Sequence, residues 1–407
     1  MDEQDVVIVG GGAAGVGAAR ALAGRNLRVL LVEASARIGG RARTERVGGC
    51  ALDLGCGWLH SAERNEWVGI AEAAGFPVDR TPSSWGEQYR ALGFSPADQD
   101  ASGKAYDAFN TRLRTAALAS DRASDAIGRE NDWKPFVEAL SGYINGAELE
   151  ALSVADYLAY DDAASETNWR LPEGYGTLVA ASLPRDVAVA LATPVTRITG
   201  QDPRLKIDTH RGPIVARAVI VTVSTNVLGA IRFDAALDGP LHAASQLPLG
   251  LADKLFLAVD GAEDIAADAH LLGDPRNAGT GSYYLRPFGN PVIEAFFGGP
   301  GARALGREGL DGAAAFAIDE LVALLGSGWR RRLRLVAASR WAQEDWIRGS
   351  YSHALPGCAG SRATLRNPVD SRIYFAGEAC SAQDFSTAHG AFASGTTAAQ
   401  RVLGAFG

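Results

Sequence analysis

Residues 6–15 read Val-Val-Ile-Val-Gly-Gly-Gly-Ala-Ala-Gly, and an alanine-rich run then leads to the apolar residues 29–32, which are followed by Glu33. This order predicts a strand, a turn, a helix and a second strand. The β-branched residues 6–9 suit a strand that is buried on both faces. The glycines that follow allow the backbone to turn sharply and to approach a phosphate group without an intervening Cβ atom.

The glycine spacing in this stretch is that of a dinucleotide-binding turn. Gly10, Gly12 and Gly15 fit the pattern GxGxxG, and a helix beginning near Ala13 would offer free N–H groups to a pyrophosphate. Glu33 follows Gly15 by 18 residues, close to the spacing of about 20 for the acid that binds a ribose hydroxyl. Its carboxylate would repel a 2′-phosphate, so the pattern disfavours NADP.

A second glycine motif lies just beyond Glu33. Residues 34–43 read Ala-Ser-Ala-Arg-Ile-Gly-Gly-Arg-Ala-Arg, so that Arg41 can bring a guanidinium to the same pyrophosphate. A nicotinamide dehydrogenase has no evident use for this motif. Together with residues 52–60, Leu-Asp-Leu-Gly-Cys-Gly-Trp-Leu-His, the two motifs resemble the FAD-binding amine oxidases, which include monoamine and polyamine oxidases and flavin-dependent histone demethylases. The alternative is a dinucleotide fold that binds NAD.

The resemblance implies an α/β protein, in which a Rossmann-type FAD-binding domain of the glutathione reductase kind carries an inserted α+β substrate domain. The composition changes where such an insert would begin, because residues 81–171 are rich in Ala, Asp and Glu with helical spacing of apolar residues. Short strands are expected at residues 214–218 and 218–223, alternating strands follow residue 247, and a helix is expected at residues 312–325. We expect the FAD-binding domain in residues 1–80, 172–246 and 335–407, and the substrate domain in residues 81–171 and 247–334.

Composition is that of a folded globular chain of 407 residues, with 47% hydrophobic and 21% charged residues. The four cysteines lack CxxC spacing, so neither a metal site nor a disulfide scaffold is expected. The first strand leaves no room for a leader, and no apolar run reaches the ~18 residues of a membrane span. We therefore expect a cytoplasmic protein without a membrane anchor, as a monomer or homodimer.

The net charge of −8 is concentrated in one segment. Residues 81–180 hold 16 acidic and 8 basic side chains, and the rest of the chain is balanced. Such a segment disfavours nucleic acid as a partner and would attract small cations such as protonated amines. A solvated acidic surface that only maintains solubility explains the same count.

Further flavin contacts follow from the resemblance. Residues 371–378 are typical of a strand running into a turn, and a helix beginning near Ala388 would direct its N-terminus at the flavin N1/O2 edge, where negative charge develops on reduction. Glu378 would bind the ribityl chain, and Val195 the adenine, although Val195 also fits an ordinary β-ribbon. The implied FAD-binding residues are Gly10, Gly12, Ala13, Ala14, Gly15, Glu33, Ala34, Arg41, Gly57, Trp58, Val195, Trp341, Gly377, Glu378, Thr387 and Ala388.

Three residues are implied to act on the substrate. Lys254 matches the family lysine that holds a water molecule beside flavin N5, Tyr351 matches one wall of an aromatic cage, and His60 resembles a substrate-facing histidine of animal polyamine oxidases. A histidine with an ordinary pKa near 6.5 could accept a proton from an amine or orient it. The alternatives are an exposed lysine, a core aromatic residue and a capping histidine.

Two departures from the family pattern bear on cofactor and substrate. Ser350 stands where monoamine oxidases have a flavin-linked cysteine, which implies non-covalent FAD, and Thr387 stands where a second cage aromatic is expected. The missing wall disfavours compact arylalkylamines and favours the polyamine oxidase or demethylase end of the family.

The expected function is therefore the oxidation of an amine to an imine, with hydride transfer to flavin N5 and reduction of O₂ to peroxide. One rival is a flavin dehydrogenase or desaturase of the same fold acting on a non-amine substrate. Another is a flavin-binding partner protein without turnover.

Overall fold

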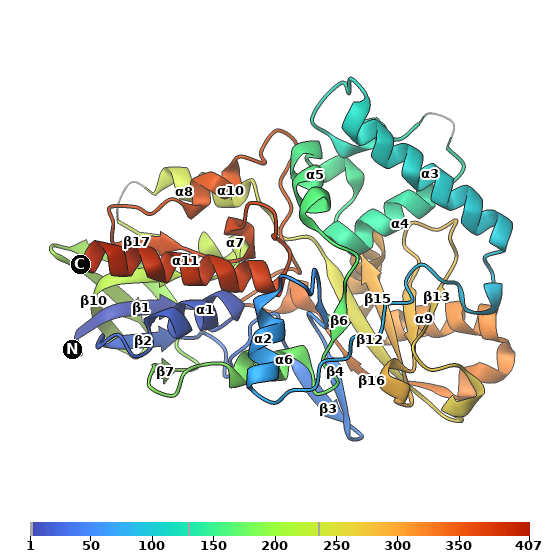
Figure 1. Ribbon diagram of the computed structural model, residues 1–407, viewed down its shortest axis with the longest axis horizontal. Coiled ribbons are helices and arrows are strands. Elements are labelled where there is room, and N and C mark those ends of the chain that lie inside the picture. The colour runs from blue at the N-terminus through green and yellow to red at the C-terminus, as the bar shows by residue number, and fades with distance from the viewer. Residues whose placement is uncertain (1–2, 129–130, 235–236) are drawn as a thin grey trace.

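The computed structural model describes residues 3–128, 131–234 and 237–407. Two sheets organise the chain, one near both chain ends and one at the opposite end of the molecule (Figure 1). The larger sheet has the order β11-β8-β9-β10-β1-β2-β7, and β17 also pairs with β10. Its strands are β1 (Glu3–Val9), β2 (Val29–Val32), β7 (Ala188–Ala190), β8 (Val195–Gln201), β9 (Arg204–Thr209), β10 (Gly212–Val221), β11 (Arg232–Phe233) and β17 (Ile373–Phe375).

Strand β1 lies at the centre of the larger sheet. It runs parallel to both neighbours, with Ile8 opposite Ile220 of β10 and Leu31 of β2. Residues 6–9 are at most 4% exposed, because helices cover one face and a second apolar cluster covers the other. The continuous β-branched run is explained by this double burial, and the predicted Rossmann-type fold is confirmed.

Helices α1 (Ala13–Leu22) and α11 (Ala388–Phe406) lie side by side against this sheet (Figure 1). Their backbones approach closely at two glycines. A Cβ atom at Gly17 would lie 2.4 Å from the Phe392 carbonyl oxygen, and one at Gly395 would lie 1.9 Å from that of Ala14. The C-terminal helix α11 is thereby held against α1, although the two are separated by almost the whole chain.

The second sheet is antiparallel, with the order β13-β14-β15-β12-β16. Its strands are β12 (Ala252–Val259), β13 (Ala269–Leu272), β14 (Ser282–Leu285), β15 (Val292–Gly298) and β16 (Leu333–Ala338). Helix α9 (Pro300–Leu325) packs on it, and α3 (Pro96–Thr115), α4 (Lys134–Asn145) and α5 (Val154–Ala163) form the neighbouring helical part. We propose these two parts as the substrate domain; β16 continues this sheet across residue 335.

Smaller elements connect the two parts. The remaining strands form the pairs β3 (Thr44–Val47) with β4 (Cys50–Asp53), and β5 (Trp58–Leu59) with β6 (Trp169–Arg170). The remaining α-helices are α2 (Glu66–Ala73), α6 (Tyr175–Ala181), α7 (Thr225–Leu228), α8 (Asp238–Ser245) and α10 (Ser361–Arg366). Within the described ranges, no helix combines the length and apolar character needed to cross a membrane.

Two details differ from the sequence-based interpretation. The separate strands expected at residues 214–218 and 218–223 are one strand, β10. Along one edge it pairs first with antiparallel β9 and then with parallel β17, while parallel β1 pairs with residues 215–221 on the other edge. The helix expected at residues 312–325 begins at Pro300, because a proline is well placed at a helix start. Gly309, with φ of 75°, interrupts that helix.

The close packing around Gly15 predicts that one added methyl group lowers the stability of the protein considerably. A Cβ atom there would lie 2.0 Å from the carbonyl oxygen of Gly10, which cannot move without displacing β1. We expect Gly15→Ala to lower the free energy of unfolding by roughly 2–3 kcal/mol, the upper part of the usual cost of overpacking. Urea unfolding measures this. Gly69→Ala, in α2 with no atom within 4 Å of the new methyl group, is the matched control and should stabilise slightly; equal effects would contradict the prediction.

Candidate active site

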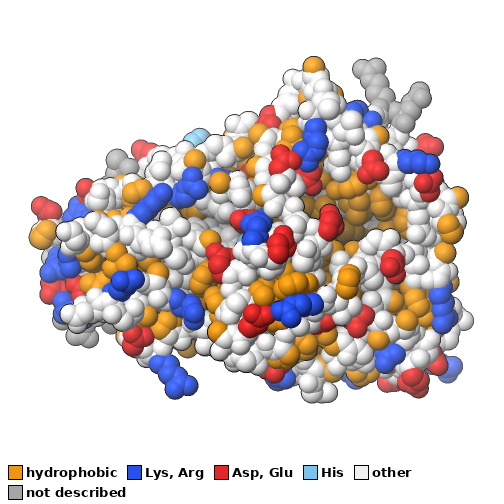
Figure 2. All heavy atoms as spheres, viewed as in Figure 1, with side chains coloured by type: hydrophobic (Ala, Val, Ile, Leu, Met, Phe, Trp, Pro, Cys, Tyr) orange, Lys and Arg blue, Asp and Glu red, His pale blue; other side chains and the backbone are white. Residues whose placement is uncertain are grey.

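A cavity of about 940 Å³ extends from the glycine turn after β1 to the second sheet. Figure 2 shows a hollow in this face of the molecule, with hydrophobic side chains inside it and acidic side chains among those at its rim. All of the predicted FAD-binding residues except Gly15 line this cavity, as do Lys254, His60 and Tyr351. The structure therefore brings the residues together, while their individual roles stay predictions.

The end of the cavity beside β1 presents groups that suit a dinucleotide. Helix α1 begins there, and its N-cap Gly12 has no side chain to satisfy the first-turn N–H groups, which leaves them for a ligand. The Glu33 carboxylate accepts hydrogen bonds from the N–H groups of Gly11 (2.6 Å) and Ser35 (2.7 Å). It is held at the cavity wall with lone pairs remaining for ribose hydroxyl groups.

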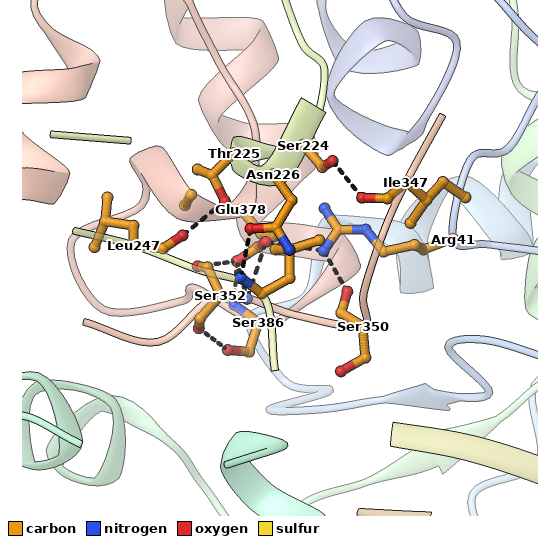
Figure 3. Close-up of polar contacts among 12 residues, drawn as sticks. Arg41, Ser224, Thr225, Asn226, Leu247, Ile347, Ser350, Ser352, Glu378 and Ser386 are labelled. Atoms are coloured by element: carbon orange, nitrogen blue, oxygen red, sulfur yellow. Dashed lines mark hydrogen bonds and ion pairs between the residues drawn. The ribbon is translucent and has the colours of Figure 1, made fainter. Parts of the chain in front are cut away.

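Arg41 and Glu378 meet at the cavity wall (Figure 3). Arg41 Nη1 lies 2.9 Å from Glu378 Oε1 and also donates to the Ser350 carbonyl oxygen. Burial alone would raise the pKa of Glu378. The guanidinium groups of Arg41 and Arg362, with hydrogen bonds from Ser352 and Ser386, outweigh burial and lower that pKa. Glu378 thus orients Arg41 toward the cavity, in addition to the ribityl contact expected of it.

Two further polar side chains bear on the fit of a flavin. The Ser350 hydroxyl is buried at the cavity wall and has no hydrogen-bond partner among the described residues. Such a buried orphan is consistent with a ligand that supplies the missing partner. Thr387 is the N-cap of α11, and its hydroxyl oxygen accepts from the Gly390 N–H at 3.0 Å. This helix N-terminus faces the cavity, as expected for stabilising a reduced flavin.

Trp341 is fixed from two sides. Its indole N–H donates to the Leu54 carbonyl oxygen at 3.2 Å, and its backbone N–H donates to the carboxylate of Asp253 at 3.0 Å. Asp253 also accepts from Ser339 at 2.8 Å. Asp253 was not among the residues predicted from the sequence. The available signal was a carboxylate in a largely apolar strand, on the face opposite to Lys254.

Lys254 is only 7% exposed, so it is not the surface lysine that the alternative interpretation required. Its Nζ atom lies 2.8 Å from Glu294 Oε1 and beside Gly57, where an added Cβ atom would be 3.2 Å away. Glu294 was also missed. Strand register could have indicated it, because Phe296 lies opposite Lys254 and Glu294 is two residues further on the same face.

His60 is held by an amide. Its Nδ1 atom lies 2.7 Å from Asn168 Oδ1, while Asn168 Nδ2 donates to the Glu166 carbonyl oxygen. Because the amide oxygen can only accept, Nδ1 carries the proton and Nε2 is left with a lone pair. Burial lowers the pKa of His60 to about 4, against the opposing effect of the Asn168 hydrogen bond. His60 is therefore neutral at physiological pH and can accept a hydrogen bond from a substrate.

Aromatic side chains surround the part of the cavity nearest His60. Trp58 lies 4.4 Å from Trp85 and 5.7 Å from Tyr284, measured between ring centroids. On another wall, the hydroxyl of Tyr351 donates to the carbonyl oxygen of Tyr143. Tyr351 is thus fixed as a cavity wall, and its ring face remains available to pack substrate carbons.

Buried histidines predict how stability depends on pH. Burial lowers the pKa of His353, as it does that of His60, to about 4. An unfolded histidine binds a proton below about pH 6.5, whereas these two stay neutral in the folded protein. The unfolded state is therefore favoured as pH falls from 6.5 to 4, with a slope approaching about 1.4 kcal/mol per pH unit for each histidine.

The measurement is urea unfolding at pH 7.5 and 5.5. Above pH 5, Glu378 adds little, because its lowered pKa produces a loss only below the ordinary carboxyl value. Burial raises the pKa of Asp53 and Asp253, which acts in the opposite sense. His353→Gln isolates the histidine contribution and should show a smaller loss between the two pH values. A loss identical to that of the wild type would contradict the assignment.

Together, the parallel strands around β1, the glycine turn and the cavity define a dinucleotide-binding fold. A model of the family described as flavin containing amine oxidoreductase matches residues 13–403. The chain belongs to this family of FAD-dependent amine oxidoreductases, which confirms the resemblance stated above.

Curated relatives extend over nearly the whole chain. Polyamine oxidase 2 of Arabidopsis thaliana is 27% identical and covers 99% of this chain and 89% of its own length. Polyamine oxidase 3 of Oryza sativa subsp. japonica is 29% identical, with 97% and 88% covered. Among solved structures, a putrescine oxidase bound to putrescine has a TM-score of 0.80 at 19% identity and covers 99% of both chains. That likeness supports the fold.

Proposed function

We propose that this protein oxidises an aliphatic di- or polyamine, with non-covalent FAD as the hydride acceptor and O₂ as the final acceptor, which is reduced to peroxide. Bound FAD supplies the redox chemistry. The names of the curated relatives support this substrate class, and so does the charge of the cavity.

The proposal rests on the charge of the cavity wall that residues 81–171 and 247–334 form. Among the described residues of these segments that line the cavity, Glu87, Asp161, Glu166 and Glu294 are acidic, and Lys254 is the one basic side chain apart from histidines. Such a wall attracts a substrate with more than one ammonium group. Thr387, in place of an aromatic wall, leaves room for a flexible chain.

The residues around the reacting carbon would have separate roles. Neutral His60 accepts a hydrogen bond from the amine nitrogen, and the aromatic rings of Tyr351 and Trp58 exclude water and pack the methylene groups. Lys254, held by Glu294, would present a positive charge to the flavin when it is bound. No side-chain nucleophile is required, since the hydride moves directly to the cofactor.

Further properties belong to the same proposal. FAD is bound without a covalent link, because Ser350 rather than a cysteine stands at the expected attachment position. Its hydroxyl lines the cavity and could contact the flavin. We propose a cytoplasmic monomer or homodimer that does not use nucleic acid as a partner.

The test is anaerobic reduction of the purified holoenzyme. Spermine, spermidine, putrescine, benzylamine and L-amino acids are added separately, and the loss of visible flavin absorbance is followed. Oxygen is then admitted, and the peroxide formed is assayed. We expect rapid bleaching by the aliphatic amines with two or more nitrogens and slow bleaching by benzylamine. Bleaching by benzylamine alone would reject the substrate class, and no bleaching by any amine would reject amine oxidation.

A further inference from the structure

A series of hydrogen-bonded, mostly buried polar side chains connects the helical part of the proposed substrate domain to the wall of the cavity. It begins at Asp156 in α5, whose carboxylate accepts from Arg362 Nε at 2.6 Å and from Nη2 at 2.8 Å. Arg362 Nη1 donates to Ser352 Oγ at 2.9 Å, and that hydroxyl donates to Glu378 Oε2 at 2.6 Å. Glu378 in turn holds Arg41, as Figure 3 shows.

The side chains of this hydrogen-bonded series are buried, except for that of Arg41. The side chains of Arg362, Asp156 and Glu378 are 3%, 6% and 6% exposed, and Ser352 is 1% exposed. Arg362 is further enclosed by the Phe385 ring, 3.6 Å from its guanidinium carbon. Arg41, with a side chain 28% exposed, is the member that opens into the cavity.

The bonding leaves little freedom at any step. The Asp156–Arg362 pair is bidentate, which fixes the plane of the guanidinium as well as its position. Arg362 therefore presents Nη1 to Ser352 in one orientation, and Ser352 has a single hydroxyl hydrogen, which it donates to Glu378. A buried ion pair is often no more stabilising than apolar residues of similar volume, so overall stability alone is a weak explanation for this arrangement.

We propose that Asp156 and Arg362 are positioning residues for the flavin site, acting through Ser352 and Glu378 to hold the Arg41 guanidinium at the cavity wall. By this arrangement, a helix of the substrate domain contributes to FAD retention without touching the cofactor. The proposal rests on the proposed role of Arg41 in FAD binding and is independent of which amine is oxidised.

The test measures FAD release from purified holoenzyme, by the rise in flavin fluorescence after dilution, together with the melting temperature of the apoprotein. Ser352→Ala removes the hydroxyl that links Arg362 to Glu378. Arg362→Lys keeps the positive charge but loses the planar guanidinium that pairs with Asp156 through two nitrogens. We expect each variant to release FAD about tenfold faster, as for the loss of a hydrogen bond to a charged group. Arg303→Lys alters an exposed ion pair with Glu148 and should leave release unchanged.

A second control separates positioning from stability. Val137→Ala removes buried volume from the helical core, where Val137 is 0% exposed, and lowers the melting temperature without touching the chain of contacts. If the same fall in melting temperature is accompanied by the same increase in the FAD release rate in Val137→Ala and in Ser352→Ala, the proposal is overturned. Wild-type release in both Ser352→Ala and Arg362→Lys would overturn it as well.

Coupling to Arg41 gives an independent outcome. If Arg362 acts through Arg41, then Arg362→Lys should change FAD release little in an Arg41→Lys background, since the residue it positions is already altered. Fully additive effects of the two substitutions would overturn the proposal, whereas failure of the amine-oxidation test above would leave these FAD measurements unaffected.

Discussion

Lys254→Met is expected to slow flavin reduction or reoxidation by about 100-fold or more, the usual effect of removing a charged donor preorganised at a reaction centre. Lys254 Nζ is buried between Glu294 and Gly57 at the cavity wall. Methionine retains most of the side-chain length and removes the charge. FAD should be retained, because the groups predicted to bind its phosphates belong to the other sheet and its helices.

Stopped-flow absorbance measures the two half-reactions separately, first under anaerobic mixing with substrate and then by mixing reduced enzyme with oxygen. Lys134→Met is the control, since the Lys134 side chain is 55% exposed and pairs only loosely with Glu138 at 3.5 Å. Unchanged rate constants for both half-reactions in Lys254→Met would remove this residue from the active site.

Glu294→Gln is expected to raise KM for an aliphatic diamine by roughly 10- to 100-fold, which corresponds to losing a hydrogen bond to a charged group of about 1.5–3 kcal/mol. The amide has the same shape as the carboxylate and lacks its charge. A second ammonium group on the substrate can share Glu294 with Lys254, because the carboxylate has lone pairs beyond the one directed at Nζ.

The substrate panel makes this prediction specific. KM for benzylamine, which has no second nitrogen, should change much less than KM for putrescine. Glu138→Gln, at a half-buried position on α4 away from the cavity, should leave both values at the wild-type level. A fall in kcat for every substrate with unchanged KM would instead show that Glu294 serves only to hold Lys254.

Much of the FAD-binding part could be predicted because its signals are local. The strand before Gly10, the helix after Gly12 and the acid at Glu33 lie within one short stretch, and backbone geometry follows directly from that order of residues. The helix beginning at Ala388 was predicted for the same reason and is observed with Thr387 as its N-cap.

Predictions were weaker where partners are distant in sequence. The division of β10 into two strands was wrong, because one edge of this strand pairs first with β9 and then with β17, and composition does not report a change of partner. Lys254 was selected by resemblance and by the apolar residues that follow it, whereas its pairing with Glu294 depends on how β12 and β15 align.

The sequence by itself determined the fold class, the dinucleotide turn and the family, since these depend on contiguous residues whose spacing sets backbone conformation. Only the tertiary structure decided the electrostatics of the site. His60 meets Asn168 across 108 residues, and Asp156 meets Arg362 across 206. Burial and hydrogen bonding between such distant groups set the proton on His60 and the orientation of Arg41, because charge depends on what surrounds a side chain in space.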